Sequence, residues 1–213
     1  MKKIIYKILR LLGMKKIKMV FELIWIKSYL TETGFVKSYT KGFPVDRNDH
    51  NYPWWTYSFT DFLKGRLKND MSIFEYGAGN STIFLSNFVG TVTSVEHDEL
   101  WYKDLKNKLK KNVRLIYSKP ENYVDEIQKK KIKYDIVIID GIKRNECAQK
   151  SIDYLSKRGV IIFDDTDRKK YEKSYMYLLD RGFKRIDFTG LAPCSINMNS
   201  TSVFYKEGNV LGI

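Results

Sequence analysis

Short continuous apolar runs alternate along the chain with longer segments in which apolar residues recur every three or four positions. The first pattern is typical of strands buried on both faces of a sheet, and the second of amphipathic helices. The runs predict strands over 72–76, 91–95, 113–117, 134–141, 160–165, 183–188 and 201–206. The recurrences predict helices over 58–67, 99–111, 120–131, 144–157 and 168–181, with one more beginning near Thr82. This order predicts an α/β fold, a doubly wound sheet with helices on both faces.

Turn and capping residues set the expected boundaries of these elements. Gly159 and Gly182 are placed to end the helices that precede them. Ser118 and Glu121 have the spacing of a capping box, which favours a helix that starts at Pro120. Residues 189–200, between the last two strands, are expected to form a loop long enough to fold over the edge of the sheet where ligands bind.

The first 57 residues differ from the rest, and we expect a helical and aromatic extension over 1–57 ahead of a main domain over 58–213. In residues 1–12, apolar side chains share one helical face and Lys3, Lys7 and Arg10 the other. Charges interrupt the apolar run, so we expect neither a secretory signal nor a membrane span. The alternatives are an interfacial helix resting on anionic lipid, or a helix packed on the domain or on a second subunit.

The segment that follows is more apolar and then becomes aromatic. Residues 17–30 predict a buried or dimerising helix, so a homodimer is one expectation, and 34–59 predict a loop. His50 to Tyr57 has an unusual density of aromatic residues just ahead of the first strand. The segment is either a hydrophobic plug over that strand or a wall beside a ligand, because aromatic rings hold flat or sugar-like groups well.

The most informative stretch is 71–98. A strand ends there on Glu75-Tyr76-Gly77-Ala78-Gly79, and the two glycines let the backbone turn sharply and approach a ligand. Asn80 and Ser81 are good helix N-caps, so the next helix should direct its free N–H groups at that ligand. The following strand then ends on Glu96-His97-Asp98. A strand, a glycine turn, a helix and a strand with an acidic end form half of a nucleotide-type domain.

The acid ahead of the glycines decides which nucleotide is expected. The dinucleotide fingerprint needs a third glycine where Thr82 stands, whereas here Glu75 precedes the first glycine. This E-x-G-x-G-x-S pattern resembles motif I of class I S-adenosylmethionine-dependent methyltransferases, in particular their small bacterial members. The resemblance covers about residues 58–207 and implies a Rossmann-like sheet of seven strands with the last strand inserted antiparallel.

The same resemblance implies a set of cofactor-binding residues. In the family the glycine turn passes under the methionine part of S-adenosylmethionine, and the acid at the end of the second strand takes both ribose hydroxyls. A carboxylate accepts two hydroxyl protons well, and its charge suits a sulfonium cation. The residues assigned in this way to S-adenosylmethionine are Glu75, Tyr76, Gly77, Gly79, Asn80, Ser81, Glu96, His97 and Asp140.

Further carboxylates end the fourth and fifth strands. The chain also resembles catechol-type O-methyltransferases, which hold Mg²⁺ with an Asp after the fourth strand and an Asp-Asn pair after the fifth. Asp140, Asp164 and Asp165 stand at those places, and Lys143 matches the family's general base. Three hard oxygen ligands would suit Mg²⁺. The alternatives are that the acids cap helices or face the cofactor and acceptor without a metal, and that Lys143 begins a solvated helix or binds an anionic acceptor.

The composition limits the kinds of metal, substrate and partner expected for the chain. Cys147 and Cys194 are far apart and predict free thiols in a reducing, cytoplasmic compartment, and with two histidines a histidine-built zinc site is not expected. Of the net charge of +13, +8 lies in residues 1–41, so most of the excess is in the N-terminal segment rather than spread around the carboxyl ends of the strands. This placement counts against nucleic acid as the substrate, and it allows peripheral contact with the inner face of the membrane through residues 1–12.

The resulting hypothesis is O-methylation of a small molecule, a sugar or a cell-envelope precursor. Methyl transfer to a hydroxyl needs the acceptor aligned with the donor and a group that removes the proton. Asp140 is the first choice for that group, ahead of Lys143 and Asp164. The alternative functions are an RNA methyltransferase, suggested by a pI near 9.5, and a cofactor-binding protein without catalysis.

Overall fold

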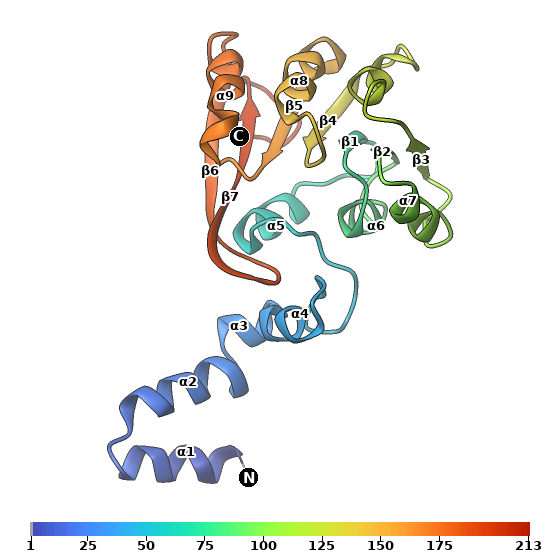
Figure 1. The fold of residues 1–213 in the computed structure, drawn as a ribbon. Coiled ribbons are helices and arrows are strands. Elements are labelled where there is room, and N and C mark those ends of the chain that lie inside the picture. The colour runs from blue at the N-terminus through green and yellow to red at the C-terminus, as the bar shows by residue number, and fades with distance from the viewer. Residues whose placement is uncertain (1) are drawn as a thin grey trace.

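Seven strands form a single sheet in the order β3-β2-β1-β4-β5-β7-β6 in the computed structural model, which describes residues 2–213 (Figure 1). Strands β1 to β5 run parallel, and β7 is antiparallel to both β5 and β6. The α/β sheet with an antiparallel last strand is therefore confirmed. The strands are β1 Ser72–Tyr76, β2 Thr91–Glu96, β3 Val113–Tyr117, β4 Tyr134–Ile139, β5 Leu155–Asp164, β6 Lys184–Ala192 and β7 Ser195–Tyr205.

Helices cover both faces of the sheet, as predicted from the alternation of elements. Apolar residues of α5 and α6 pack on one face, and those of α8 and α9 pack on the other. The helices of the main domain are α5 Tyr57–Lys64, α6 Asn80–Leu85, α7 Glu99–Lys106, α8 Arg144–Ser151 and α9 Glu172–Leu179. Three short 3₁₀ helices, Tyr123–Gln128, Ile152–Tyr154 and Lys169–Tyr171, lie between them.

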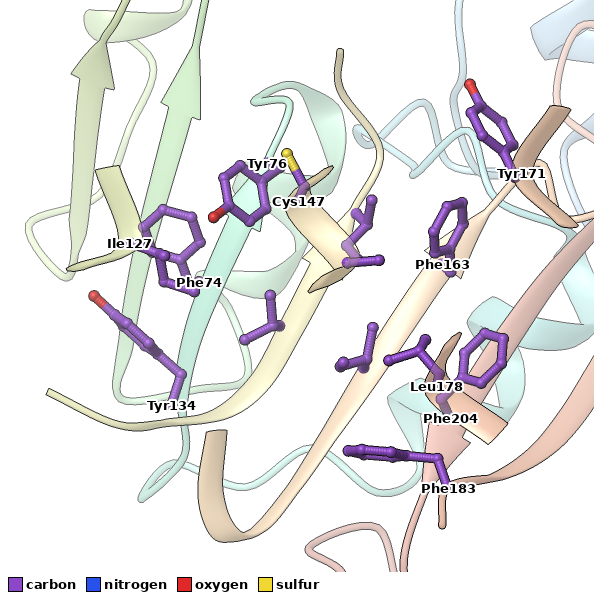
Figure 2. Close-up of a cluster of buried hydrophobic side chains, with 14 of the residues drawn as sticks. Phe74, Tyr76, Ile127, Tyr134, Cys147, Phe163, Tyr171, Leu178, Phe183 and Phe204 are labelled. Carbon is purple, nitrogen blue, oxygen red and sulfur yellow. The ribbon is translucent and has the colours of Figure 1, made fainter. Parts of the chain in front are cut away.

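The central strands separate two buried hydrophobic clusters. Successive side chains of a strand point to opposite faces, so Phe74 belongs to one cluster and Ile73 to the other. Figure 2 shows the first cluster, in which Phe74, Phe163 and Phe204 lie along three strands of the sheet. Each such side chain contributes about 1.5–3 kcal/mol by leaving water. The two clusters fix the sheet and thereby the positions of the strand ends.

Several predicted helix boundaries were wrong because side chains made other hydrogen bonds. Asn80 and Ser81 are not N-caps: α6 begins at Asn80, and the backbone N–H of Gly79 donates to Thr82 Oγ1 at 3.0 Å. Ser118 does not form a capping box with Glu121, because its hydroxyl donates to Glu126 Oε1 at 2.8 Å. The segment after Ser118 accordingly forms only a short 3₁₀ helix.

Two further predictions concerned glycines. Gly159 does not end a helix but lies inside β5, where an added Cβ would come within 2.9 Å of the carbonyl oxygen of Tyr134. The close approach coincides with a shift of register between β4 and β5. Gly182 follows α9 with a φ of +79° and ends that helical segment as predicted.

The predicted loop over 189–200 is instead the end of a hairpin. Strands β6 and β7 continue through it to a tight turn at Pro193 and Cys194, where Cys194 has a φ of +61°. Thr189 pairs with Ser200 across the ladder, and their hydroxyl oxygens lie 3.1 Å apart. The ladder makes this segment a two-stranded arm, and its end lies on the side of the sheet nearer the N-terminal helices (Figure 1).

The N-terminal segment forms helices α1 Lys2–Leu11, α2 Lys15–Trp25, α3 Tyr29–Glu32 and α4 Phe35–Lys41. The predicted loop over 34–59 therefore contains α4 and the start of α5. Among the described side chains of α2, Phe21 is the buried one, so this helix is not buried within the chain as one alternative had it. Within residues 2–213, no helix is long and apolar enough to cross a membrane. The domain boundary after residue 57 stays a prediction.

Candidate functional site

A cavity of about 590 Å³ lies at the carboxyl ends of β1, β2, β4 and β5. Ligand sites of open α/β sheets lie at this edge, and volumes of about 300–1,000 Å³ are typical of small-molecule sites. Both residues that were assigned to the site from the sequence and residues that were not line this cavity. The lining residues are Trp54, Gly77, Ala78, Gly79, Asn80, Ser81, Glu96, His97, Trp101, Asp140, Gly141, Ile142, Asp164, Asp165, Arg168, Ala192, Pro193, Ser195 and Asn199.

The glycine turn forms one side of this cavity. Gly77 has a φ of +94°, and a Cβ on it would lie 2.7 Å from the carbonyl oxygen of Asp140. A side chain is therefore excluded where the turn after β1 meets the end of β4. The indole Nε1 of Trp101 donates to the carbonyl oxygen of Ala78 at 2.7 Å, and an added Cβ on Gly79 would touch the same indole at 3.8 Å. The turn is thus held against an aromatic ring.

Glu96 joins the end of β2 to the glycine turn. Its carboxylate accepts from the backbone N–H groups of His97 and Asp98, both at 2.7 Å, and from that of Ala78 at 3.2 Å. The side chain of His97 lies beside it, with Nδ1 2.9 Å from Glu96 Oε1. The structure therefore places Glu96, His97 and the glycine turn together in the cavity wall, fixed by backbone donors.

Glu75 and Tyr76, also assigned to the cofactor, lie behind the wall instead of lining it. Glu75 is fully buried, and its Oε2 accepts from the hydroxyls of Thr82 at 2.5 Å and Ser94 at 2.6 Å. Burial raises the pKa of Glu75 to about 7. The Thr82 hydroxyl also accepts from the Gly79 N–H, so Glu75 stabilises the glycine turn through Thr82. The Tyr76 hydroxyl donates to the Val124 carbonyl at 2.8 Å.

The opposite side of the cavity is a cluster of carboxylates around Arg144. Asp140 Oδ1 lies 2.9 Å from Arg144 Nη2, and Asp165 Oδ2 lies 3.0 Å from Nη1. The same guanidinium donates to the backbone oxygens of Asp164 at 2.7 Å and Gly141 at 3.0 Å. Arg144 is therefore a largely buried cation with an acceptor at each of its three guanidinium nitrogens.

The residues predicted to hold Mg²⁺ do not fit that ion. The guanidinium of Arg144 already lies between Asp140 and Asp165, and Asp164 Oδ1 accepts from the Thr201 hydroxyl at 2.6 Å. Throughout residues 2–213, no three His, Cys, Asp or Glu side chains are grouped so that they could hold a metal ion. A fixed internal cation stands where the sequence interpretation placed the metal, so the Mg²⁺ prediction finds no support.

Two carboxyls of this cluster, those of Asp140 and Asp164, have shifted pKa values. Burial raises the pKa of Asp140, while the charge of Arg144 opposes the shift. Burial, followed by the negative charges of Asp140 and Asp165, raises the pKa of Asp164 well above its ordinary value. Asp140 Oδ2 also accepts from the indole Nε1 of Trp55 at 3.1 Å. Lys143, the other predicted catalytic residue, is exposed and lies outside the cavity lining.

Sequence reasoning gave no site role to several residues that contribute here, among them Trp101 and Arg144. Trp101 follows the spacing of a core face, yet its ring lines the cavity. Arg144 adjoins Lys143 in sequence, and only the fold shows that it pairs with the carboxylates of Asp140 and Asp165. Trp54 and Trp55 belong to the aromatic segment that was expected to be either a plug or a wall. Trp55 is fully buried and Trp54 lines the cavity, so the segment has features of both.

Comparison with known proteins shows the fold. No family model and no curated protein sequence matches the chain. A precorrin-6y C5,15-methyltransferase from Geobacter metallireducens is similar in structure, with a TM-score of 0.57 and 19 % identity over 70 % of this chain and 88 % of that one. An rRNA methylase from Streptococcus thermophilus has a TM-score of 0.52 and 19 % identity over 69 % and 93 %.

A putative methyltransferase from Streptococcus mutans, solved with S-adenosylhomocysteine (SAH), has a TM-score of 0.51 and 15 % identity over 68 % of this chain and 94 % of that one. These neighbours are class I S-adenosylmethionine-dependent methyltransferases, and this chain has their fold. The first neighbour is named for a precorrin and the second for rRNA, so the likeness leaves the acceptor open.

Proposed function

We propose that the protein is an S-adenosylmethionine-dependent methyltransferase that methylates a hydroxyl oxygen of a small molecule, such as a sugar or a cell-envelope precursor. One observation carries the proposal: a single cavity joins the glycine turn and Glu96 on one side to the buried carboxyls of Asp140 and Asp164 on the other. The first side has the groups expected to hold the donor. The second has groups able to take a proton from the acceptor.

The first side of the cavity fits S-adenosylmethionine by its chemistry. Glu96 presents a fixed carboxylate for hydroxyl groups, and Trp101 presents an aromatic ring next to a turn without side chains at Gly77 and Gly79. The acids in the lining favour a cationic sulfonium over an anionic cofactor. When bound, S-adenosylmethionine supplies a methyl group activated by the positive sulfur. Gly77–Gly79, Glu96, His97 and Trp101 are the residues that would hold it.

Asp140 is the group best placed to receive the acceptor's proton. It lines the cavity, and its raised pKa makes it a stronger base than an ordinary aspartate. Trp55 and Arg144 hold its two oxygens from opposite sides and fix its orientation. Asp164, whose pKa is raised well above its ordinary value by burial and by the charges of Asp140 and Asp165, lies in the same cluster. Lys143 is set aside as the base because it does not line the cavity.

The charge distribution favours a small molecule over RNA. Among residues 2–213, the cavity lining has four acids and one arginine, Arg168, and no lysine, so phosphate groups would meet mostly negative charge. Most of the excess of positive charge, +8 of +13, lies in residues 1–41. An RNA substrate would require a basic surface around the cavity, and the lining does not supply one.

Thermal unfolding with added ligands tests the donor side. A ligand that binds the native state alone raises the melting temperature, so S-adenosylmethionine and SAH should raise it and NAD should not. Glu96→Gln should weaken this stabilisation, whereas Glu99→Gln, an exposed acid three residues away, should not. A shift with NAD alone would overturn the proposal. For the acceptor, radiolabelled donor with cell-envelope extract should label a glycan or lipid, and label confined to RNA would reject the small-molecule assignment.

A further inference from the structure

Helices α1 and α2 expose most of their large apolar side chains. Ile8 is 48 % exposed, Leu11 84 % and Trp25 52 %. The other exposed apolar residues of this segment are Ile4, Leu12, Met14, Ile17, Met19, Val20, Leu23 and Ile24. Large apolar side chains exposed at this many positions of two neighbouring helices indicate contact with a membrane or with another protein.

The same segment is strongly basic. Residues 2–27 contain eight Lys and Arg residues and a single acid, Glu22, whose carboxylate lies 3.6 Å from Lys18 Nζ. Lys7, Lys15 and Lys16 are exposed. An apolar helical face next to a lysine-rich face is the composition of helices that lie in the lipid interface. Basic residues at that depth are attracted to anionic headgroups, and the attraction falls with salt.

The shape of the segment suits a surface rather than a span. Gly13 has a φ of +65° and turns the chain between α1 and α2. The two helices have 10 and 11 residues, which at 1.5 Å per residue is about half of the hydrocarbon thickness of a bilayer. They pack on each other and lie away from the sheet (Figure 1). Both can therefore lie flat on one surface while the sheet stays in water.

We propose that α1 and α2 together bind the surface of a membrane containing anionic lipids and hold the sheet domain beside it. Charge complementarity decides between lipid and a second copy of the chain. A dimer formed through this surface would bring two segments with eight basic residues each into contact, and like charges at an interface oppose association. Anionic headgroups neutralise the same charges while the acyl region receives the apolar side chains.

Flotation of the full-length protein with lipid vesicles tests the proposal. The protein should float with vesicles of phosphatidylcholine containing phosphatidylglycerol, much less with pure phosphatidylcholine, and less as salt increases. The variant Lys7→Glu/Lys15→Glu/Lys16→Glu should lower partitioning at least a hundredfold, because each basic residue contributes on the order of fivefold. The variant Ile8→Gln/Leu11→Gln/Leu12→Gln should also lose binding.

Matched substitutions elsewhere separate this surface from general charge and hydrophobicity. Lys110→Glu/Lys111→Glu/Lys130→Glu changes the same charge on exposed lysines of the main domain, and Leu100→Gln/Met176→Gln removes exposed apolar groups there. Both should float like the unmodified protein. Equal loss in these controls, equal binding to neutral and anionic vesicles, or no flotation together with a dimer that the α1 substitutions convert to a monomer, would each overturn the proposal. Binding of S-adenosylmethionine is independent of this result, so failure here leaves the proposed enzymatic function standing.

Discussion

Arg144 Nη2 lies 2.9 Å from Asp140 Oδ1, and this ion pair is the centre of the acidic side of the cavity. Both side chains are largely buried, and the guanidinium also contacts Asp165 and the backbone of Asp164. Removing one partner of a buried pair leaves a charge with neither water nor a counterion, which is costly. The arrangement makes Arg144 a structural cation for the whole cluster.

We therefore expect Arg144→Met to lower the free energy of unfolding by about 3–5 kcal/mol at neutral pH. Urea unfolding followed by circular dichroism measures this change. Arg168→Met is the matched control: Arg168 lies 2.9 Å from Asp165 but is half exposed, so its loss should cost about 1 kcal/mol or less. Equal effects of the two substitutions would contradict the assignment of Arg144 as the cation of the cluster.

Metal dependence gives a second check on the same cluster. Because the guanidinium holds Asp140 and Asp165, neither EDTA nor added Mg²⁺ should change the melting temperature or the binding of SAH. Differential scanning fluorimetry is sufficient for the first quantity and calorimetry for the second. A reproducible increase in melting temperature with Mg²⁺ that is lost in Asp165→Asn would restore the metal interpretation.

The glycine turn should not tolerate a side chain at Gly77. Gly77→Ala would place a methyl group 2.7 Å from the carbonyl oxygen of Asp140 at a φ of +94°. We expect it to lower the free energy of unfolding by about 3 kcal/mol or more, combining the backbone penalty with a clash between two strand ends. Gly182→Ala has a similar φ of +79° with open space around it, and should cost only about 1 kcal/mol. Similar costs at both positions would show that the close approach is absent.

Glu75 should make stability depend on pH in a particular direction. Its pKa rises from 4.5 to about 7 on folding because it is buried, so the native state binds more protons than the unfolded state between these values. Stability therefore decreases as pH rises from about 4.5 to about 7, by about 3 kcal/mol from this group. Unfolding free energies measured across this range for the protein and for Glu75→Gln should converge at the acidic end and diverge toward neutrality. Parallel profiles would contradict the shift.

Catalysis should depend on Asp140 more than donor binding does. Asp140→Asn keeps the shape of the side chain but cannot take a proton, so labelling of acceptor in cell-envelope extract should fall about a hundredfold to ten-thousandfold. Calorimetric binding of S-adenosylmethionine should change little. Asp70→Asn, at an exposed position outside the cavity, serves as the control. Undiminished labelling by Asp140→Asn would remove this residue from the proposed mechanism.

The local pattern of apolar and polar residues was enough to predict most strands. The strands over 72–76 and 113–117 have the predicted bounds, because each is a short apolar run between polar or turn residues. The hairpin arm over 189–200 was missed because its pairing joins residues such as Gly190 and Asn199, and no local signal reports that partnership. Helix ends were missed where a hydroxyl bonded a residue other than its expected capping partner, as Ser118 did with Glu126.

Part of the candidate site could likewise be predicted from the sequence, and part could not. The glycine turn and Glu96 follow one another within a single strand-helix-strand unit, so sequence order brings them together. Arg144 meets Asp165 only because β4 and β5 are neighbours in the sheet, and this contact replaces the expected metal. Trp101 has the sequence spacing of a buried helical face. Its indole instead donates to the carbonyl oxygen of Ala78, a contact that the sequence spacing does not indicate.

The hydrogen bond from Trp55 to Asp140 has a consequence for exchanging parts between related enzymes. Trp55 precedes the helix at which the main domain is expected to begin, so a chimera joined at Ser58 would graft a foreign segment onto the carboxylate proposed to deprotonate the acceptor. Such a hybrid would keep the turn proposed to bind the donor and lose the hydrogen bond that orients Asp140. A chimera designed to transfer acceptor specificity would therefore have to include Trp54 and Trp55 together with the strands of the sheet.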